Sequence, residues 1–427
     1  MKTTGPSRRS QVVACLCSLA FLAILDRVSI SSAKSDISLE LGINDTVFGW
    51  VFGVFSIGYT LMMVPSGWLA DRYGPRKTLA VSVLAWSLLT AATGWVYGTA
   101  SLLVVRLLFG VAEAGAFPGA ARAISNWLPV PERGLAMGLL NTGSRLGAAF
   151  GLWGMSVCVL SVGWRLSFVM LGIAGLVWAA LWFWWFRDWP RTLPRAAPDI
   201  ALDSPRDAPL GRLFRSTSVS VLLFQYLASQ FTFFVCFSWL LPYLKSHYGL
   251  SSAMAGMYAA IPLYVGALAN WLSGTVVDAI YRRGYWRLSR RLPAMCGFGL
   301  AAVSVLAAVS MPSANSFILC FSIATFGVDL TLSPSWTACA DIGGRHTGTL
   351  SGAMNMMGAI GALLSAVLFP FLSDLTGNIK CYFYVAAFLN LAAMAGWAVV
   401  LRNEISSIEE GRVRLPQSKL EMGVHSK

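Results

Sequence analysis

Seven ionisable residues lie inside long apolar stretches of this chain, where burying a charge is costly. In a membrane, such groups face a polar cavity or a partner of opposite charge, and they mark binding or proton-transfer sites. A guanidinium group recognises carboxylates and phosphates through paired hydrogen bonds, whereas a carboxyl group can exchange a proton. The residue types therefore point to anion binding and proton transfer. The seven residues are Asp26, Arg27, Arg106, Glu113, Arg122, Arg145 and Asp329.

The depth of these groups in their apolar stretches separates them. At a helical rise of 1.5 Å per residue, Glu113 lies about 18 Å from the outer end of its stretch and Arg145 about 15 Å from the inner end of another. Both are therefore near mid-membrane. Asp26 and Arg27 are adjacent in the outer third of the first stretch. Arg106 precedes Glu113 by seven residues on the same helix face, and we expect it to belong to a charge network with groups on other helices.

The central charges carry a positive surplus. Arg27, Arg106 and Arg145 outnumber the carboxylates Asp26 and Glu113 by one. A surplus cation in a medium of low dielectric constant favours an anion. A carboxylate beside an arginine can exchange a proton in a useful pH range, because burial and the cation act on it in opposite senses. These groups suit the carriage of a proton with an anion, and the alternative is a buried ion network that locks helices together.

The remaining charges have simpler explanations beside the functional ones. Asp329, which we also assign to the charge network, is either a second proton site or a capping residue where Pro334 disrupts the helix. Arg122 lies near the inner end of its stretch, where pairing with Asp71 or contact with water accounts for it. Asp278 and Asp341 lie at inner helix ends, and we interpret them as gate or capping groups.

The elements that must hold these residues are membrane-spanning helices. The chain has 427 residues, is 56% hydrophobic and only 12% charged, whereas about a quarter of the residues of a soluble domain are charged. About 20 apolar residues cross a bilayer as a helix. Windows of that size predict an all-α integral membrane protein of twelve transmembrane helices in two pseudo-symmetric six-helix bundles. The windows are 11–31, 47–69, 78–97, 101–123, 135–160, 165–186, 217–242, 253–279, 291–311, 316–340, 347–372 and 380–402.

The basic residues predict the orientation of these helices. Of 32 Lys and Arg, 24 lie in the gaps on the N-terminal side and 4 in the opposite gaps, which places both termini in the cytoplasm. The net charge of +13 thus reflects membrane sorting, and we expect no nucleic-acid partner. The predicted organisation is an N-terminal bundle (1–190), a proline-rich cytoplasmic linker (191–216), a C-terminal bundle (217–402) and a cytoplasmic tail (403–427).

A charged turn and its weaker copy reveal an internal duplication. The turn runs from Gly67 to Thr78 and reads GWLADRYGPRKT, and the spacing of Gly67 and Asp71 recurs 207 residues later in Gly274 and Asp278. A near-constant shift is typical of two bundles that rock around a central site. We expect the turn to form an inner gate. The predicted gate residues are Gly67, Asp71, Arg72, Arg76, Asp278 and Arg122. A second repeat, shifted by 214, links Gly138, Asn141 and Gly147 to Gly352, Asn355 and Gly361.

These motifs resemble a known transporter family. The turn is similar to the loop signature of the major facilitator superfamily. Within that superfamily, Leu25-Asp26-Arg27 and the pattern from Arg106 through Glu113 to Pro118 resemble the anion:cation symporter family. The resemblance continues through Trp127-Leu128-Pro129, Asn141-x-Gly143-Ser144 and the segment Trp239 to Leu244. It implies proton-coupled transport of organic anions, often sugar acids such as hexuronates, galactonate or glucarate.

The resemblance also implies roles for individual residues. Arg27 would bind the substrate carboxylate, Asp26 and Glu113 would exchange protons, and Asn141, Ser144 and Asn355 would bond substrate hydroxyls. Arg145 departs from the pattern, because relatives usually carry a neutral residue after the serine. A second central arginine either favours a dicarboxylate or balances Asp329 or Glu113. The short first outer loop favours a bacterial inner membrane over the vertebrate branch of the family.

Other functions fit the residues less well. An organophosphate:phosphate antiporter of the same fold is the first alternative, because arginine also binds phosphate. A nutrient sensor without transport is the second. A membrane enzyme is disfavoured, because His247, His346 and His425 all lie in loops or the tail. We expect a monomer in the lipid bilayer whose partners are a small organic anion and protons, with no cofactor and no metal.

Overall fold

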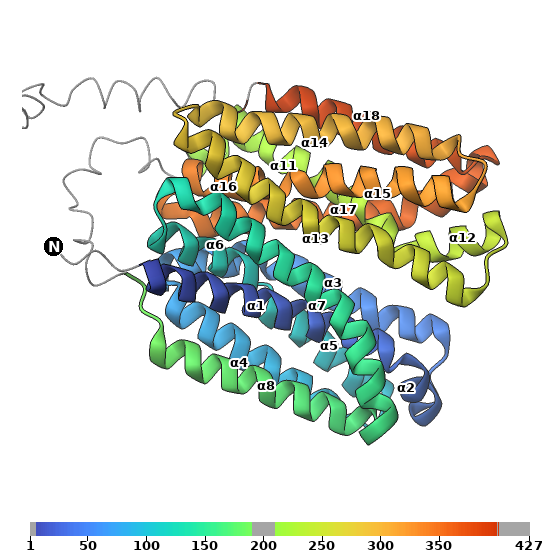
Figure 1. Cartoon of the computed structure of the whole chain (residues 1–427). Helices are drawn as coiled ribbons and strands as arrows, with labels where there is room; N and C mark the ends of the chain where they lie inside the picture. Colours follow the sequence, from blue (N-terminus) through green and yellow to red (C-terminus); the bar gives the residue numbers. More distant parts are fainter. Residues whose placement is uncertain (1–5, 190–209, 399, 401–427) are drawn as a thin grey trace, which may run out of the picture.

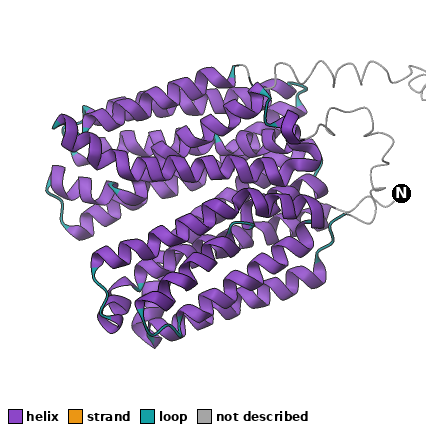
Figure 2. Cartoon of the chain, turned by 180° about the vertical axis from the view of Figure 1, so that it is seen from behind, coloured by secondary structure: helices purple, strands orange, loops and turns teal. Residues whose placement is uncertain are grey.

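The computed structural model describes residues 6–189, 210–398 and 400, and in this part of the chain it contains helices and no strand. Two helical bundles lie side by side, the first drawn in blue to green and the second in yellow-green to red (Figure 1). The view from behind shows the same two layers of helices (Figure 2). Most of the predicted linker (191–216) and the whole predicted tail (403–427) lie outside the described residues.

The twelve predicted spans are confirmed. Nine stretches are long and apolar enough to cross a membrane among the described residues; one of them, 314–376, contains two spans, and α4 and α18 complete the twelve. The first half contains α1 (Pro6–Ser32), α3 (Asp45–Tyr73), α4 (Pro75–Thr93), α5 with α6 (Thr99–Glu113 and Ala116–Trp127), α7 (Arg133–Val162) and α8 (Trp164–Trp185). The second half contains α11 with α12 (Thr217–Ser238 and Leu240–Tyr248), α13 (Ser252–Arg282), α14 (Trp286–Val309), α15 with α16 (Ala314–Leu330 and Leu332–Gly343), α17 (Thr347–Thr376) and α18 (Lys380–Trp397). Short helices α2 (Lys34–Leu41) and α10 (Leu210–Leu213) lie between spans.

The fourth and tenth spans are interrupted near their centres. A disruption by Pro334 was one of the two explanations that the sequence offered for Asp329, whereas the break in the fourth span was not predicted. Pro118 and Pro334 cause the breaks, because a proline lacks an N–H group and its ring collides with the carbonyl four residues earlier. The first segments, α5 and α15, end at Glu113 and Leu330. Each break therefore leaves an acidic residue, Glu113 or Asp329, at the end of a half-helix in the middle of the membrane.

Glycines let α1 and α7 pack closely within the first half. A Cβ atom at Gly143, Gly147 or Gly151 would collide with α1, so only glycine permits this approach. The contacts of these glycines with the α1 backbone join residues 126 apart, which sets α1 and α7 side by side in parallel. The facing residues are Cys17, Phe21 and Leu25 respectively.

The two halves touch most closely at one end of the molecule. We call this the motif end; it contains the turn at Gly74 (φ +84°) that joins α3 to α4. There α3 crosses α17 so closely that a Cβ atom at Gly67 would overlap the backbone of Gly348. In the same way, α7 crosses α13 where Gly138 lies against the carbonyl group of Asn270. These small residues therefore serve close helix packing.

Candidate functional site

Arg27 and Glu113 form an ion pair between the first and fourth spans. The Nη2 atom of Arg27 lies 2.5 Å from Glu113 Oε1, and Nε donates to the same oxygen at 3.1 Å. Glu113 is fully buried, and its second oxygen, Oε2, has no hydrogen-bond partner among the described residues. The Arg27 side chain is 27% exposed although it lies within the bundle. The pair therefore combines an acid that is buried from solvent with an arginine that is partly accessible to solvent.

Aromatic rings and an amide extend this pair towards the second half. The Arg27 guanidinium group lies 4.4 Å from the ring centroid of Tyr59 and 5.2 Å from that of Phe55. The Tyr59 hydroxyl group accepts a hydrogen bond from Asn355 Nδ2 of α17 at 3.2 Å. Arg27 of one half is thus connected to Asn355 of the other through Tyr59, which the sequence analysis did not identify.

Asp26 and Arg106 lie beside this pair and are almost completely buried, each 2% exposed. Asp26 Oδ1 and Arg106 Nε have no hydrogen-bond partner in the described parts of the chain. The Arg106 guanidinium group lies 4.6 Å from the centroid of Phe109, and cation–π attraction partly replaces its lost hydration. The charges of Arg106, Asp26, Arg27 and Glu113 act on one another, so the four residues form one electrostatic cluster.

Arg145 and Asp329 form a second ion pair, and this one joins the two halves. Arg145 Nη2 lies 2.5 Å from Asp329 Oδ1, and Nε donates to Oδ2 at 3.3 Å. The arginine comes from α7 and the aspartate from α15. Phe233 of α11 covers the guanidinium group at 3.7 Å. Counting Asp329, three arginines now face three carboxylates near the centre, so the positive surplus of the sequence count disappears while all three acids are ionised.

The other predicted substrate residues make local bonds in this conformation. Asn141 Nδ2 donates to the carbonyl group of Met137 at 2.9 Å, and Ser144 Oγ donates to that of Leu140 at 3.4 Å. Both side chains are less than 9% exposed. Of the three predicted hydroxyl-binding residues, Asn355 therefore lies beside the Arg27 cluster, whereas the donors of Asn141 and Ser144 are directed to their own helix.

Two aspartates at the motif end bind helix N-termini of the opposite half. Asp71, at the end of α3, accepts hydrogen bonds from the backbone N–H groups of Gly348 and Thr349 at 2.8 and 2.7 Å. Asp278, near the end of α13, accepts from those of Gly134 and Leu135 at 2.9 and 2.8 Å. A carboxylate is favourable there because the N-terminus of a helix carries partial positive charge. The two contacts are related by the internal duplication.

Arginines surround these two contacts. Arg122 lies 3.6 Å from Asp71 and donates to the carbonyl group of Gly344 in the second half at 2.7 Å. Arg76 donates to the carbonyl group of Phe183 within its own half, at 2.9 and 2.7 Å. Arg72 stacks 5.1 Å from the centroid of Trp68, also in its own half. Of the predicted gate cations, Arg122 is the one whose described contacts cross between the halves.

Asp341, which the sequence analysis interpreted as a gate or capping group, forms an acidic centre at the motif end. Asp341 of α16 accepts from Arg290 Nε at 3.0 Å and from Arg133 Nη1 at 3.4 Å, and the latter contact joins the two halves. The sequence analysis missed the equivalence of Glu113 and Asp329, although the shift of 216 between them resembles the shifts of the other repeats. A systematic comparison of the two proline-containing spans would have found it.

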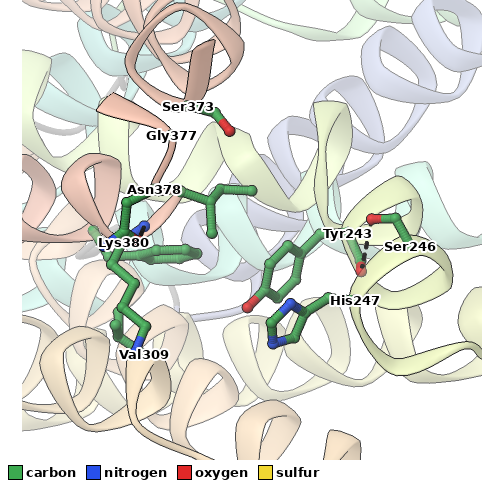
Figure 3. Close-up of a pocket in the computed structure, with 10 residues that line it drawn as sticks. Tyr243, Ser246, His247, Val309, Ser373, Gly377, Asn378 and Lys380 are labelled. Atoms are coloured by element: carbon green, nitrogen blue, oxygen red, sulfur yellow. Dashed lines mark hydrogen bonds between the residues drawn. The ribbon is translucent and has the colours of Figure 1, made fainter. Parts of the chain in front are cut away.

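A separate pocket opens at the end of the second half opposite the motif end. It has a volume of about 360 Å³ and is lined by residues of α12, α17 and α18, among them Tyr243, His247 and Lys380 (Figure 3). Tyr243 and His247 stack with ring centroids 5.0 Å apart. None of the predicted site residues lines this pocket, so it is distinct from the central charges.

Twelve spans in two related halves, with ion pairs at mid-depth, define a multi-pass membrane transporter rather than an enzyme. The chain belongs to the Major Facilitator Superfamily, whose family model matches residues 16–366. The resemblance to its anion:cation symporter family is confirmed by the relatives that the chain matches over most of its length.

Those relatives are bacterial transporters of small acids. A probable sulfoacetate transporter of Cupriavidus necator is 32% identical over 91% of this chain and 93% of its own. A hexuronate transporter of Bacillus subtilis is 28% identical over 88% of this chain and 90% of its own. A probable L-galactonate transporter of Escherichia coli is 27% identical over 91% and 88%.

Solved structures show the same fold at low sequence identity. A proton:xylose symporter has a TM-score of 0.77 at 14% identity, covering 92% of this chain and 96% of that one. A human organic anion transporter has a TM-score of 0.73 at 17% identity, covering 92% and 100%.

Proposed function

We propose that this protein is a proton-coupled symporter of a small organic anion such as a sugar acid, working by alternating access. The ion pair between Arg27 and Glu113 is the observation that carries the proposal. One partner is an anion-binding cation that is 27% exposed, and the other is a fully buried acid. The names of the relatives, transporters of sulfoacetate, hexuronate and galactonate, support an organic anion as the cargo.

In this proposal, Glu113 and the substrate compete for Arg27. A proton that binds to Glu113 neutralises the carboxylate and releases the two N–H groups of Arg27 that bonded to it. The substrate carboxylate then accepts those hydrogen bonds, and Asp26 serves as the neighbouring proton acceptor. Asn355, which is linked to Arg27 through Tyr59, would bond a substrate hydroxyl group. Proton and anion thus enter together, because each removes the electrostatic cost of the other.

In this proposal, the central site opens to the two sides of the membrane in turn. We place the motif end in the cytoplasm of a bacterial inner membrane, as the distribution of Lys and Arg predicts. With Asp71 and Asp278 bound to the opposite half, the described conformation is closed at that end. Binding of anion and proton would weaken this closure and expose the site to the cytoplasm.

Transport by the purified protein in proteoliposomes tests the proposal. We expect an inward proton gradient to raise the uptake of galactonate or a hexuronate, a protonophore to abolish the increase, and Arg27→Ala to abolish uptake. Thermal-shift screening with sugar acids, dicarboxylates and sugar phosphates would identify the preferred class, because a ligand of the folded state raises its stability. Exchange of a sugar phosphate for phosphate without proton dependence would favour the antiporter, and binding without any flux would favour the sensor.

A further inference from the structure

The ion pair between Arg145 and Asp329 has the composition of a second anion site. We propose that this transporter takes small dianions with an acid group at each end, one bound by Arg27 and the other by Arg145, and that Asp329 accepts a second proton. The inference rests on the proposed function and specifies its substrate class. Its basis is that the two Arg–carboxylate pairs match in chemistry and burial, and that their acids occupy equivalent places in the duplicated fold.

The two acids are equally protected and the two arginines are both accessible. Glu113 and Asp329 have fully buried side chains, whereas the side chains of Arg27 and Arg145 are 27% and 13% exposed. Arg145 donates to Asp329 through Nε and Nη2, whereas its Nη1 atom makes no hydrogen bond with the part of the chain that the structure describes. The guanidinium group is thus held in place while part of its donor edge remains available.

The packing of α1 on α7 fixes how far apart the two arginines lie along the helix axes. The contacts that join α1 to α7 link residues 126 apart, so Arg27 lies level with position 153 of α7, eight residues beyond Arg145. This places their backbones about 12 Å apart along the axis. Tyr59 packs on Arg27, and Tyr226 interacts electrostatically with both Tyr59 and Arg145. A ligand whose two acid groups lie at opposite ends of a short chain matches this arrangement.

The charges balance for a dianion that enters with two protons. A proton on Asp329 forms an O–H bond and ends the ion pair, so the Nε and Nη2 hydrogens of Arg145 become free for a substrate oxygen. The same exchange occurs between Glu113 and Arg27. Two protons and two substrate charges then leave the net charge of the centre unchanged, which avoids an unpaired charge in the membrane.

Arg145 lies where α7 contacts the second half, so the Arg145–Asp329 ion pair is affected when the two halves move apart. Four residues of α7 contact the second half in succession from the motif end towards the middle of the protein: Gly134, Gly138, Thr142 and Arg145. Of these four contacts, the ion pair of Arg145 lies farthest from the motif end. Opening the motif end separates Arg145 from Asp329. A bound dianion and a proton supply new partners for these groups, so the loaded carrier opens without exposing either charge unpaired.

The test compares gluconate with glucarate, which have the same six-carbon chain and differ in having one or two carboxylates. The variant is Arg145→Gln combined with Asp329→Asn, which removes both charges and leaves no buried charge unpaired. We expect the wild type to take up glucarate with two protons, and the double variant to lower the glucarate-to-gluconate uptake ratio at least about tenfold. The number of protons per glucarate, measured from the gradient that stops net flux, should fall by one.

Arg165→Gln is the matched control, because Arg165 also pairs with a carboxylate, Glu40, but does so in the first turn of α8, at the end of a span. It should leave the uptake ratio and the proton number unchanged. An unaltered ratio in the double variant, or a wild type that carries gluconate but no glucarate, overturns the inference and leaves the proposed function standing. If no anion is transported at all, the proposed function fails. The dianion site would still be supported if sulfoacetate stabilised the protein against heat more than acetate does and the double variant lost this difference. Equal stabilisation by the two ligands would reject the dianion site.

Discussion

Glu113 and Asp329 occupy equivalent positions in the two halves of the protein, each five residues before the proline that interrupts its span. Each carboxylate is fully buried and accepts an arginine from another span at 2.5 Å. The arginines are not equivalent, because Arg27 belongs to the same half as Glu113, whereas Arg145 and Asp329 belong to different halves. The Arg27–Glu113 pair can therefore persist however the two halves are arranged, whereas the Arg145–Asp329 pair depends on that arrangement.

Removing the charge of Glu113 should separate proton coupling from substrate exchange. Glu113→Gln keeps the size and a hydrogen-bond acceptor for Arg27 but cannot release or accept a proton. We expect gradient-driven accumulation to disappear, while counterflow between substrate-loaded and external pools stays within about tenfold of wild type. Proteoliposome uptake with and without a proton gradient measures both. Accumulation at the wild-type level in this variant would contradict the assignment of Glu113.

The aspartates at the motif end should control the closed conformation. Asp71→Asn removes a charge that accepts two backbone N–H groups of α17, which should weaken closure by about 1–2 kcal/mol. Cys339 of α16 is buried, and its alkylation by a membrane-permeant maleimide should rise about tenfold as the closed population falls.

Asp278→Asn should act in the same direction, because its carboxylate makes the related contact with α7. Asp36→Asn is the control, since Asp36 is an exposed acid on α2 at the other end of the molecule. Equal labelling of Cys339 in all of these variants would show that the two aspartates do not hold the gate.

The close contact of α1 and α7 should not tolerate a larger residue. Gly147→Ala places a methyl group against the Phe21 carbonyl group, and we expect a loss of about 1–3 kcal/mol in stability. Thermal unfolding in detergent measures the loss. Gly256→Ala is the matched control, because a Cβ atom there meets no other atom within 4 Å and alanine favours the helix. Similar melting temperatures for both variants would argue against the packing explanation.

An acid outside the spans should make stability depend on pH. Hydrogen bonds from Trp164 Nε1 (2.6 Å) and Arg165 Nε (2.9 Å) hold the pKa of Glu40 below its ordinary value. A carboxyl group with a lowered pKa stabilises the folded state above its unfolded pKa, about 4.3, and this contribution is lost as the pH falls through the folded value.

Glu40→Gln should therefore lower the melting temperature at pH 7, and its difference from wild type should shrink as the pH falls below about 4. Glu40 is largely exposed, so we expect a small effect. Melting curves of both proteins across this pH range test the prediction. A difference in melting temperature that grows towards acid pH would contradict it.

The sequence by itself determined the class, the spans and the identity of the buried charges. These are local properties, because a run of about 20 apolar residues must cross the bilayer wherever it lies in the chain, and a charge within it is costly there. The repeat of Gly67 and Asp71 in Gly274 and Asp278 likewise required only a comparison of residues along the chain.

Only the tertiary structure decided which charges meet. Asp329 had two open explanations in the sequence, and its partner, Arg145, lies 184 residues away in the other half. Asp71 reaches α17 across 277 residues. Such pairs depend on how two separately formed bundles dock, and docking is set by the glycine contacts along α3, α7, α13 and α17 together. No single segment carries that information, so hydropathy and spacing could name the charges and suggest alternative pairs, but they could not decide between the alternatives.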